Sequence, residues 1–313
     1  RRSNEASRYP SVGMIGSVPA SAQAWVAALA AVGYFADQRM ATAVHLAVTL
    51  QRPLLLEGAP GVGKTELAKA IAIVLGRDLV RLQCYDGLDE RDALYEWNYA
   101  AQMLHARLRQ ETQSAAEIER SLYSSEYLIE RPLLKALQAP APGAVLLIDE
   151  LDRADEPFEA FLLEYLGEFQ VSIPAFKTVR AANTPVTLLT SNRSRELNDA
   201  IKRRCLFHWM TFPDRDRELA IVRAQAPGAS AQLTEAVTDF VQRMRAASDA
   251  VGLSRAPGIA EAIEWARALV ALRFTSLDPQ AVADTLGVLV KDQEDWQRLE
   301  PHIHQWLKTE TPS

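Results

Sequence analysis

Residues 54–65 read LLLEGAPGVGKT, an apolar run followed by a glycine-rich turn and the first residues of a helical pattern. They match the G-x-x-x-x-G-K-T phosphate-binding loop, in which glycines let the backbone close around a phosphate chain and free amides bind its oxygens. The apolar run and the helical spacing of Leu67, Ile71 and Leu75 argue against a chance match in a glycine-rich turn. The phosphate-binding residues predicted from this stretch are Gly58, Ala59, Pro60, Gly61, Val62, Gly63, Lys64, Thr65 and Glu66.

Two residues of this loop and two acids further along the chain are predicted to perform chemistry. Lys64 is expected to reach the β- and γ-phosphates, and Thr65 to bind Mg²⁺. A second buried strand, residues 144–148, leads directly to Asp149 and Glu150. In a phosphate-loop protein such a strand lies near the first, so we predict that Asp149 faces the metal and Glu150 polarises the attacking water. The alternative is a pair of solvated acids that end a strand.

Polar residues after a third apolar strand extend this prediction. The strand at 186–190 leads to Asn192, whose amide would hold the attacking water or sense the γ-phosphate; an asparagine in an ordinary turn is the alternative. The amphipathic segment 198–205 then carries basic residues at its end. One of Arg203 and Arg204 is predicted to project into a neighbouring subunit's nucleotide. The alternative is that these cations only stabilise the carboxyl end of a helix through its dipole.

Composition indicates a globular protein. The chain has 313 residues, 48% of them hydrophobic, which is enough for one large domain or two ordinary ones. It carries 34 basic and 40 acidic residues, so its net charge of −6 gives no support for binding nucleic acid. Cys84 and Cys205 have no metal-binding or disulfide spacing, and no apolar stretch approaches the length of a membrane span. We therefore expect a cytoplasmic protein.

The period of the apolar residues divides the chain. Residues 1–20 are rich in serine, glycine, proline and arginine without periodicity, which indicates a flexible tail. Strand and helix patterns then alternate over 21–213, which indicates an α/β nucleotide-binding domain with a parallel sheet. Residues 214–313 read as a smaller, all-helical domain. Within the α/β domain we predict an inserted segment at 85–116, a helix at 122–139 and a β-hairpin at 169–182.

The order of these features resembles an AAA+ ATPase, which has a phosphate loop, an acidic strand end, a polar strand end, an arginine pair and a helical domain. The strings EGAPGVGKTELA at 57–68, LYEWNY at 94–99 and ELDRAD at 150–155 are similar to the MoxR family. The string SRAPGIAE at 254–261 is similar to its CoxD-like branch, which is associated with maturation of a molybdenum-containing CO dehydrogenase. The resemblance implies an α/β P-loop NTPase (AAA+) core with a small helical lid domain.

The resemblance also implies roles for individual residues. Lys64 and Thr65 would belong to the Walker A motif, Asp149 and Glu150 would form the Walker B pair, and Asn192 would be the sensor-1 residue.

Basic residues outside these motifs are assigned in the same way. Arg204 is the first choice for the arginine finger, and Arg203 is the second. Many family members place a sensor-2 arginine in a Pro-Arg pair, but Pro257 is followed by Gly258 here, which leaves Arg255 as the nearest candidate.

For the whole protein, the resemblance implies ATP and Mg²⁺ as cofactors and a hexameric ring whose pore is lined by the insert and the hairpin. It also implies a von Willebrand A-domain partner and a client metalloenzyme that is remodelled or matured, as by a chaperone. Two alternatives stay open. One is a nucleic-acid motor of the same clade, although the basic side chains of the insert are offset by acidic ones. The other is a nucleotide-gated scaffold with little turnover, against which Glu150 argues.

Overall fold

A computed structural model describes residues 16–109, 121–174 and 176–307. The expected tail at 1–20 and the insert at 85–116 therefore lie partly outside the described residues. The chain forms two compact units. The first lies within Arg1–Val32, Ala36–Glu57 and Thr65–Trp209, and the second within Gly33–Phe35, Gly58–Lys64 and Met210–Ser313.

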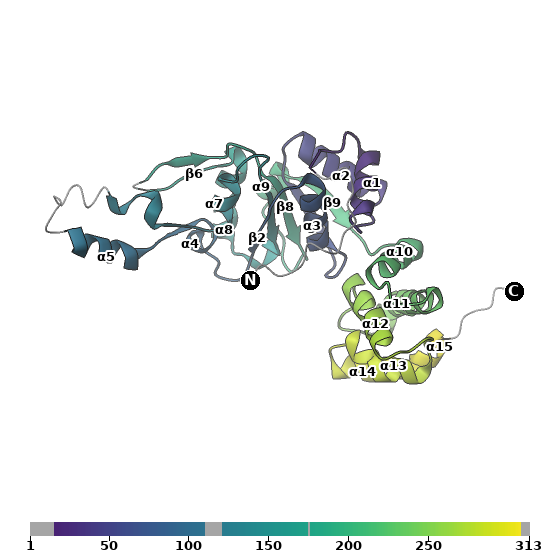
Figure 1. The fold of residues 1–313 in the computed structure, drawn as a ribbon. Helices are drawn as coiled ribbons and strands as arrows, with labels where there is room; N and C mark the ends of the chain where they lie inside the picture. Colours follow the sequence, from purple (N-terminus) through teal and green to yellow (C-terminus); the bar gives the residue numbers. More distant parts are fainter. Residues whose placement is uncertain (1–15, 110–120, 175, 308–313) are drawn as a thin grey trace. The chain divides into compact units, whose positions relative to one another are not determined.

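A five-stranded sheet is the centre of the first unit (Figure 1). Its order is β2-β5-β8-β1-β9, and the pairings β2–β5, β5–β8 and β1–β8 are parallel. Every residue of β1 and β5 is buried, as the apolar runs 54–56 and 145–148 predict, and the buried residues include Glu57 and Asp149. The strand that carries the acids is therefore separated from β1 by β8. The strands are β1 (Leu54–Gly58), β2 (Leu79–Gln83), β5 (Val145–Asp149), β8 (Val186–Ser191) and β9 (Leu206–Met210).

Helices pack around this sheet. One core joins β2, β5 and β8 to α7, α8 and α9, with Leu134, Leu162 and Tyr165 among its fully buried side chains. Asp155 begins α8 as its N-cap, where its carboxylate accepts a hydrogen bond from the amide of Phe158. The helices of this unit outside the insert are α1 (Ala22–Ala31), α2 (Gln38–Thr49), α3 (Lys64–Leu75), α7 (Pro132–Leu137), α8 (Glu156–Glu168) and α9 (Asp199–Arg204).

Two small antiparallel pairs extend from the same end of this unit, near the labels α5 and β6 in Figure 1. In the insert, β3 pairs with β4, and the hairpin consists of β6 paired with β7. Trp97 of β3 packs edge-on against Phe176 of the hairpin, with ring centroids 6.2 Å apart. These elements are α4 (Glu90–Ala93), β3 (Tyr95–Trp97), α5 (Tyr99–Arg109), β4 (Leu128–Glu130), β6 (Gln170–Ser172) and β7 (Thr178–Arg180).

The predicted helix at 122–139 is wrong. Leu122 is helical, but a short 3₁₀ turn at Ser125–Tyr127 and then β4 follow it, and the helix resumes only at Pro132–Leu137. Proline lacks an amide hydrogen and disfavours helical backbone at the preceding residue, so Arg131 is the extended N-cap and Pro132 begins the helix. The amide of Arg131 instead donates to the carbonyl of Leu94.

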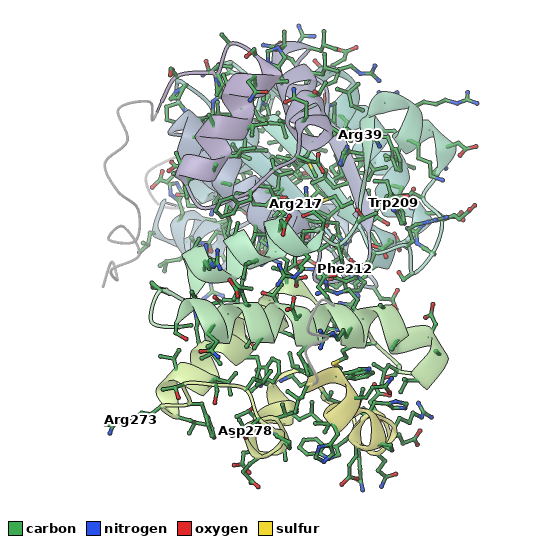
Figure 2. The ribbon with its side chains drawn as sticks, turned by 90° about the vertical axis from the view of Figure 1, so that its right-hand side faces the viewer. Arg39, Trp209, Phe212, Arg217, Arg273 and Asp278 are labelled. Atoms are coloured by element: carbon green, nitrogen blue, oxygen red, sulfur yellow. The ribbon has the colours of Figure 1, made fainter. Side chains whose placement is uncertain are left out.

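The second unit is helical apart from short segments, as predicted for residues 214–313. In its core, Phe240 packs against Trp265 and Trp306, with ring centroids 5.2 and 5.8 Å away. Arg245 lies over the ring of Phe212, 4.1 Å from its centroid, and Phe212 is labelled in Figure 2. The helices are α10 (Arg215–Gln225), α11 (Ala231–Val251), α12 (Ile259–Ala271), α13 (Pro279–Thr285), α14 (Gln293–Leu299) and α15 (Ile303–Leu307).

Candidate functional site

The phosphate loop has the backbone that its glycines predict. Gly61 and Gly63 adopt φ of +81° and +96°, values that a side chain would disfavour. The Nζ of Lys64 donates to the carbonyl oxygens of Gly58 at 2.7 Å and Ala59 at 3.0 Å, so the ammonium group is held at the loop. Tyr34, which the sequence analysis did not single out, lies against this loop, since a Cβ added to Gly63 would be 3.9 Å from its ring. The loop thus combines a positive charge with a backbone conformation that favours glycine.

A contact with the same loop, inside the second unit, explains why position 258 holds glycine and not arginine. The amide of Ile259 donates to the carbonyl of Gly61 at 3.0 Å. A Cβ added to Gly258 would lie 2.8 Å from the Cα of Gly61, so there is no room for an arginine at position 258. Arg255, the predicted sensor-2 candidate, is exposed and lies 3.7 Å from a carboxylate oxygen of Glu261. Glu66, at the start of α3, pairs with Lys69 on the exposed side of that helix.

Asp149 lies at the end of β5 and is almost fully buried. Its carboxylate accepts a hydrogen bond from the hydroxyl of Thr65 at 3.1 Å and another from Thr190 at 2.6 Å. Hydroxyl and carboxylate oxygens are the hard ligands that Mg²⁺ prefers, and Mg²⁺ usually keeps waters and substrate phosphates as its other ligands. No cluster of three His, Cys, Asp or Glu that could hold a metal occurs in the described part of the chain. Thr65 and Asp149 supply two oxygen ligands of the kind that could hold a magnesium ion.

Glu150 has a left-handed backbone, with φ of +55° and ψ of +50°. Its amide donates to the hydroxyl of Thr190, so that one hydroxyl contacts both acidic residues. Its side chain accepts hydrogen bonds from Gln83 at 2.9 Å, Arg153 at 3.0 Å and Asn192 at 3.3 Å. A residue other than glycine in this region is uncommon and costs free energy, which is typical of functional positions. The structure thus brings Glu150 and Asn192 together.

Asp152 fixes the segment that carries Asn192. Its carboxylate accepts hydrogen bonds from the amides of Asn192 and Ser194, at 3.1 and 2.8 Å, and from the Ser194 hydroxyl at 2.7 Å. Burial alone would raise the pKa of Asp152, but these hydrogen bonds to the charged carboxylate outweigh burial, and the pKa is lowered. The carboxylate is therefore ionised at neutral pH.

Arg81 contributes a cation to the same cluster. From β2, its Nε and Nη2 donate to Oδ2 of Asp149 at 3.0 and 2.6 Å, and Nη2 also donates to Gln83 at 2.5 Å. Sequence reasoning missed Arg81, Gln83, Asp152 and Thr190. The alternation of residues 79–83 places Arg81 and Gln83 on one face of a strand, but the sequence does not show that β5 lies beside that strand.

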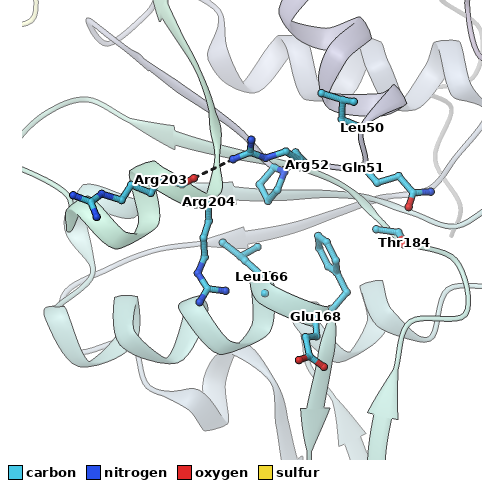
Figure 3. Close-up of a pocket in the computed structure, with 11 residues that line it drawn as sticks. Leu50, Gln51, Arg52, Leu166, Glu168, Thr184, Arg203 and Arg204 are labelled. Atoms are coloured by element: carbon cyan, nitrogen blue, oxygen red, sulfur yellow. Dashed lines mark hydrogen bonds between the residues drawn. The ribbon is translucent and has the colours of Figure 1, made fainter.

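The two predicted finger arginines point in different directions at the end of α9 (Figure 3). Arg203 points away from the cavity, and its carbonyl accepts a hydrogen bond from Arg52 at 3.0 Å. Arg204 extends towards α8, where its guanidinium lies so close to Gly167 that a side chain there would clash with it. The guanidinium of Arg204 makes no hydrogen bond or ion pair with any residue that the structure describes. It lies in an open cavity of about 510 Å³.

Both cysteines are buried and inert. Burial raises the pKa of Cys84 and of Cys205 to about 12, and the acids around Cys84 act in the same direction. Neither thiol is therefore a nucleophile at neutral pH. Among the described helices, none has the length and apolarity needed to cross a bilayer.

Residues 53–205 match the sequence profile of the AAA domain (dynein-related subfamily). A stretch of 48 residues is 50% identical to midasin of Giardia intestinalis, which amounts to 15% of this chain and 1% of midasin. RuvB of Thermotoga maritima, a Holliday junction branch migration motor, is 19% identical, with a TM-score of 0.45 over 82% of this chain and 70% of RuvB. A candidate ATPase of Cytophaga hutchinsonii is 16% identical, with a TM-score of 0.40 over 84% of this chain and 86% of that protein. The predicted fold class, a parallel P-loop NTPase sheet with a helical C-terminal region, is confirmed.

Proposed function

We propose, from the premise that residues 53–205 are an AAA+ domain, that this chain is an ATPase that binds ATP with Mg²⁺. The observation that carries the proposal is the cluster at the end of β5. There, Asp149 accepts a hydrogen bond from Thr65, and Glu150 accepts one from Asn192. Phosphoryl transfer to water needs these two functions side by side, a metal-binding carboxylate and a base that orients the water. Solvated acids that merely end a strand would have no need of these partners.

Each residue then has a defined task. Thr65 and Asp149 would hold Mg²⁺, which supplies positive charge to the phosphate oxygens. Lys64 would bind the β- and γ-phosphates. Glu150 accepts a hydrogen bond from Asn192, which orients its carboxylate so that it can polarise a water in line with the γ-phosphorus. The loop amides complete the cradle for the phosphates.

The test compares Glu150→Gln with Glu168→Gln, a matched change of an exposed acid paired with Arg180. ATP binding and steady-state hydrolysis are measured separately. We expect Glu150→Gln to bind ATP normally and to hydrolyse it at least about a hundredfold more slowly, while Glu168→Gln behaves as the wild type. Equal turnover in all three proteins would contradict the role of Glu150. Binding without turnover in the wild type would instead support a nucleotide-gated scaffold.

At a finer level, we propose a MoxR-type ATPase that remodels a client protein as a chaperone, in a cytoplasmic hexameric ring with a von Willebrand A-domain partner. A metalloenzyme is the proposed client. Sequence similarity to that family supports this, and so does the surface of α5, where Tyr99, Met103, Leu104 and Leu108 are 64, 61, 59 and 72% exposed. An apolar helix face of this kind suits a polypeptide better than a phosphate backbone.

The class of client is tested with a photo-crosslinking amino acid at Met103, on the Glu150→Gln background with ATP. Crosslinking to a purified metalloenzyme subunit, lost when Leu108 becomes Ser, would support the chaperone. Binding to duplex DNA that weakens steeply with salt would contradict it and favour the nucleic-acid motor. Because Leu108 is exposed, the serine variant should keep the wild-type stability within about 0.5 kcal/mol.

A further inference from the structure

The guanidinium of Arg81 is hydrogen-bonded to Asp149, the carboxylate proposed to bind the metal. Arg81 makes two hydrogen bonds to Oδ2 of Asp149, while Thr190 donates to Oδ1 and Thr65 is within 3.3 Å of both oxygens. The carboxylate therefore has hydrogen-bond donors on both oxygens. Oδ2 is the oxygen shared by Arg81 and Thr65, which is the residue predicted to bind Mg²⁺.

Arg81 and Asp149 differ sharply in their exposure to water. The side chain of Arg81 is 49% exposed, whereas that of Asp149 is only 4% exposed. The arginine can leave the carboxylate and regain hydration, but the carboxylate cannot move to water without unfolding its strand. Of the two groups, Arg81 is therefore the one that can move away, while the carboxylate of Asp149 stays in place.

A metal ion at Thr65 and Asp149 repels a guanidinium placed on the same oxygen. Two cations within a few ångströms of each other in a partly buried site interact unfavourably, and the oxygen has too few lone pairs for both sets of bonds. Arg81 is held on the carboxylate by a third bond, to Gln83. Its removal therefore requires the loss of several hydrogen bonds at once.

We propose that Arg81 is a positioning residue that competes with Mg²⁺ for Asp149 and so weakens metal binding to the nucleotide-bound protein. The inference rests on the proposed function, because it concerns the metal that accompanies ATP. Arg81 affects the metal indirectly, because both would bind the carboxylate of Asp149. In this way the sequence of β2, and not only the two ligand residues, sets the metal concentration at which the site fills.

The experiment measures Mn²⁺ binding by electron paramagnetic resonance, with a non-hydrolysable ATP analogue and without turnover. Arg81→Gln removes the guanidinium from Asp149. Arg153→Gln is the matched control, because it removes an equal charge from the same cluster, where Arg153 contacts Glu150 and not Asp149. Arg81→Lys keeps the charge but cannot make the forked pair of bonds.

We expect Arg81→Gln to bind Mn²⁺ about three- to tenfold more tightly than the wild type, and Arg153→Gln to change it by less than about twofold. The Mn²⁺ affinity of Arg81→Lys should fall between those of the wild type and Arg81→Gln. This variant replaces Arg81→Gln in the comparison if the glutamine variant does not fold. Equal or weaker Mn²⁺ binding in the position-81 variants, or an equal gain in Arg153→Gln, overturns the inference. Failure of the wild type to bind the analogue even with saturating Mg²⁺ would instead overturn the proposed function.

Discussion

Asp152 shows how one buried carboxylate sets the position of a residue that reaches the chemistry. It lies only 2% exposed, three residues after Asp149, and accepts three hydrogen bonds from Asn192 and Ser194. An asparagine at position 152 has only one acceptor oxygen for these donors, so one or more of them is left unpaired.

We therefore expect Asp152→Asn to lower the free energy of unfolding at pH 7 by about 1 to 3 kcal/mol and to slow ATP hydrolysis. The pKa of Asp152 is lowered in the folded protein, so the carboxylate stabilises the fold above its unfolded pKa of about 3.9 and loses this effect as the pH falls through the folded value. Urea unfolding at a series of pH values tests this. The difference between variant and wild type should shrink in acid, and a difference that stays constant down to pH about 2 would contradict it.

The residues of the phosphate loop and of the acid pair could be predicted because their chemistry is written in consecutive positions. Thr190 could not, since its role depends on β8 lying beside β5 in a register that places it next to Asp149. Spacing along the chain does not reveal which parallel strands are neighbours. Arg81 was missed for the same reason, because β2 is the other neighbour of β5.

At the scale of the element, the helices of the second unit are joined by a buried ion pair. Both oxygens of Glu218 on α10 accept from Arg245 on α11 at 2.9 Å, and the Nε of Arg245 also donates to the carbonyl of Pro257. Glu218 is fully buried and Arg245 nearly so. Three segments of this unit therefore meet at one guanidinium.

Removing the charge of Glu218 leaves the buried guanidinium uncompensated. We expect Glu218→Gln to lower the free energy of unfolding by about 3 to 5 kcal/mol, measured by chemical denaturation. The matched control is Glu235→Gln, which breaks a half-exposed pair with Arg223 and should cost less than about 1 kcal/mol. If both changes lowered the free energy of unfolding equally, the buried pair would stabilise this unit no more than an exposed pair does.

The element predictions succeeded where a single physical signal dominated. The apolar runs 54–56 and 145–148 mark β1 and β5, and the helical unit shows a clear period, so these elements were predicted. The helix predicted at 122–139 is wrong because Pro132 disfavours helical backbone at Arg131, so a helix can begin there but cannot run through it. A three-residue strand such as β4 is also stabilised by its partner β3, which lies about thirty residues earlier and leaves no local pattern.

At the scale of the whole molecule, the proposed ring makes each active site the product of two chains. Arg204 has no partner within the described part of its own chain, as expected of a side chain that completes a neighbour's site. A protein with Arg204→Ala keeps its own Glu150, and a protein with Glu150→Gln keeps its own arginine. Each alone should be nearly inert, with turnover reduced at least about a hundredfold.

A mixture of the two inactive proteins should recover part of the lost activity, because some interfaces then combine an intact Glu150 with an intact Arg204. ATP hydrolysis is measured as a function of the mixing ratio, with Arg203→Ala in place of Arg204→Ala as the control. Arg203 points away from the cavity, so that variant should hydrolyse ATP at nearly the wild-type rate. A mixture that stays as inactive as its components would contradict an arginine supplied in trans.

The left-handed backbone of Glu150 has a consequence for any attempt to improve this protein. Left-handed conformation costs a residue with a side chain about 1 to 2 kcal/mol, which glycine avoids and asparagine reduces. Laboratory evolution that rewards heat resistance alone would therefore favour glycine or asparagine at position 150. The survivors would be robust proteins without the proposed base. Heat resistance and ATP turnover favour different residues at position 150, so a screen must select for both properties.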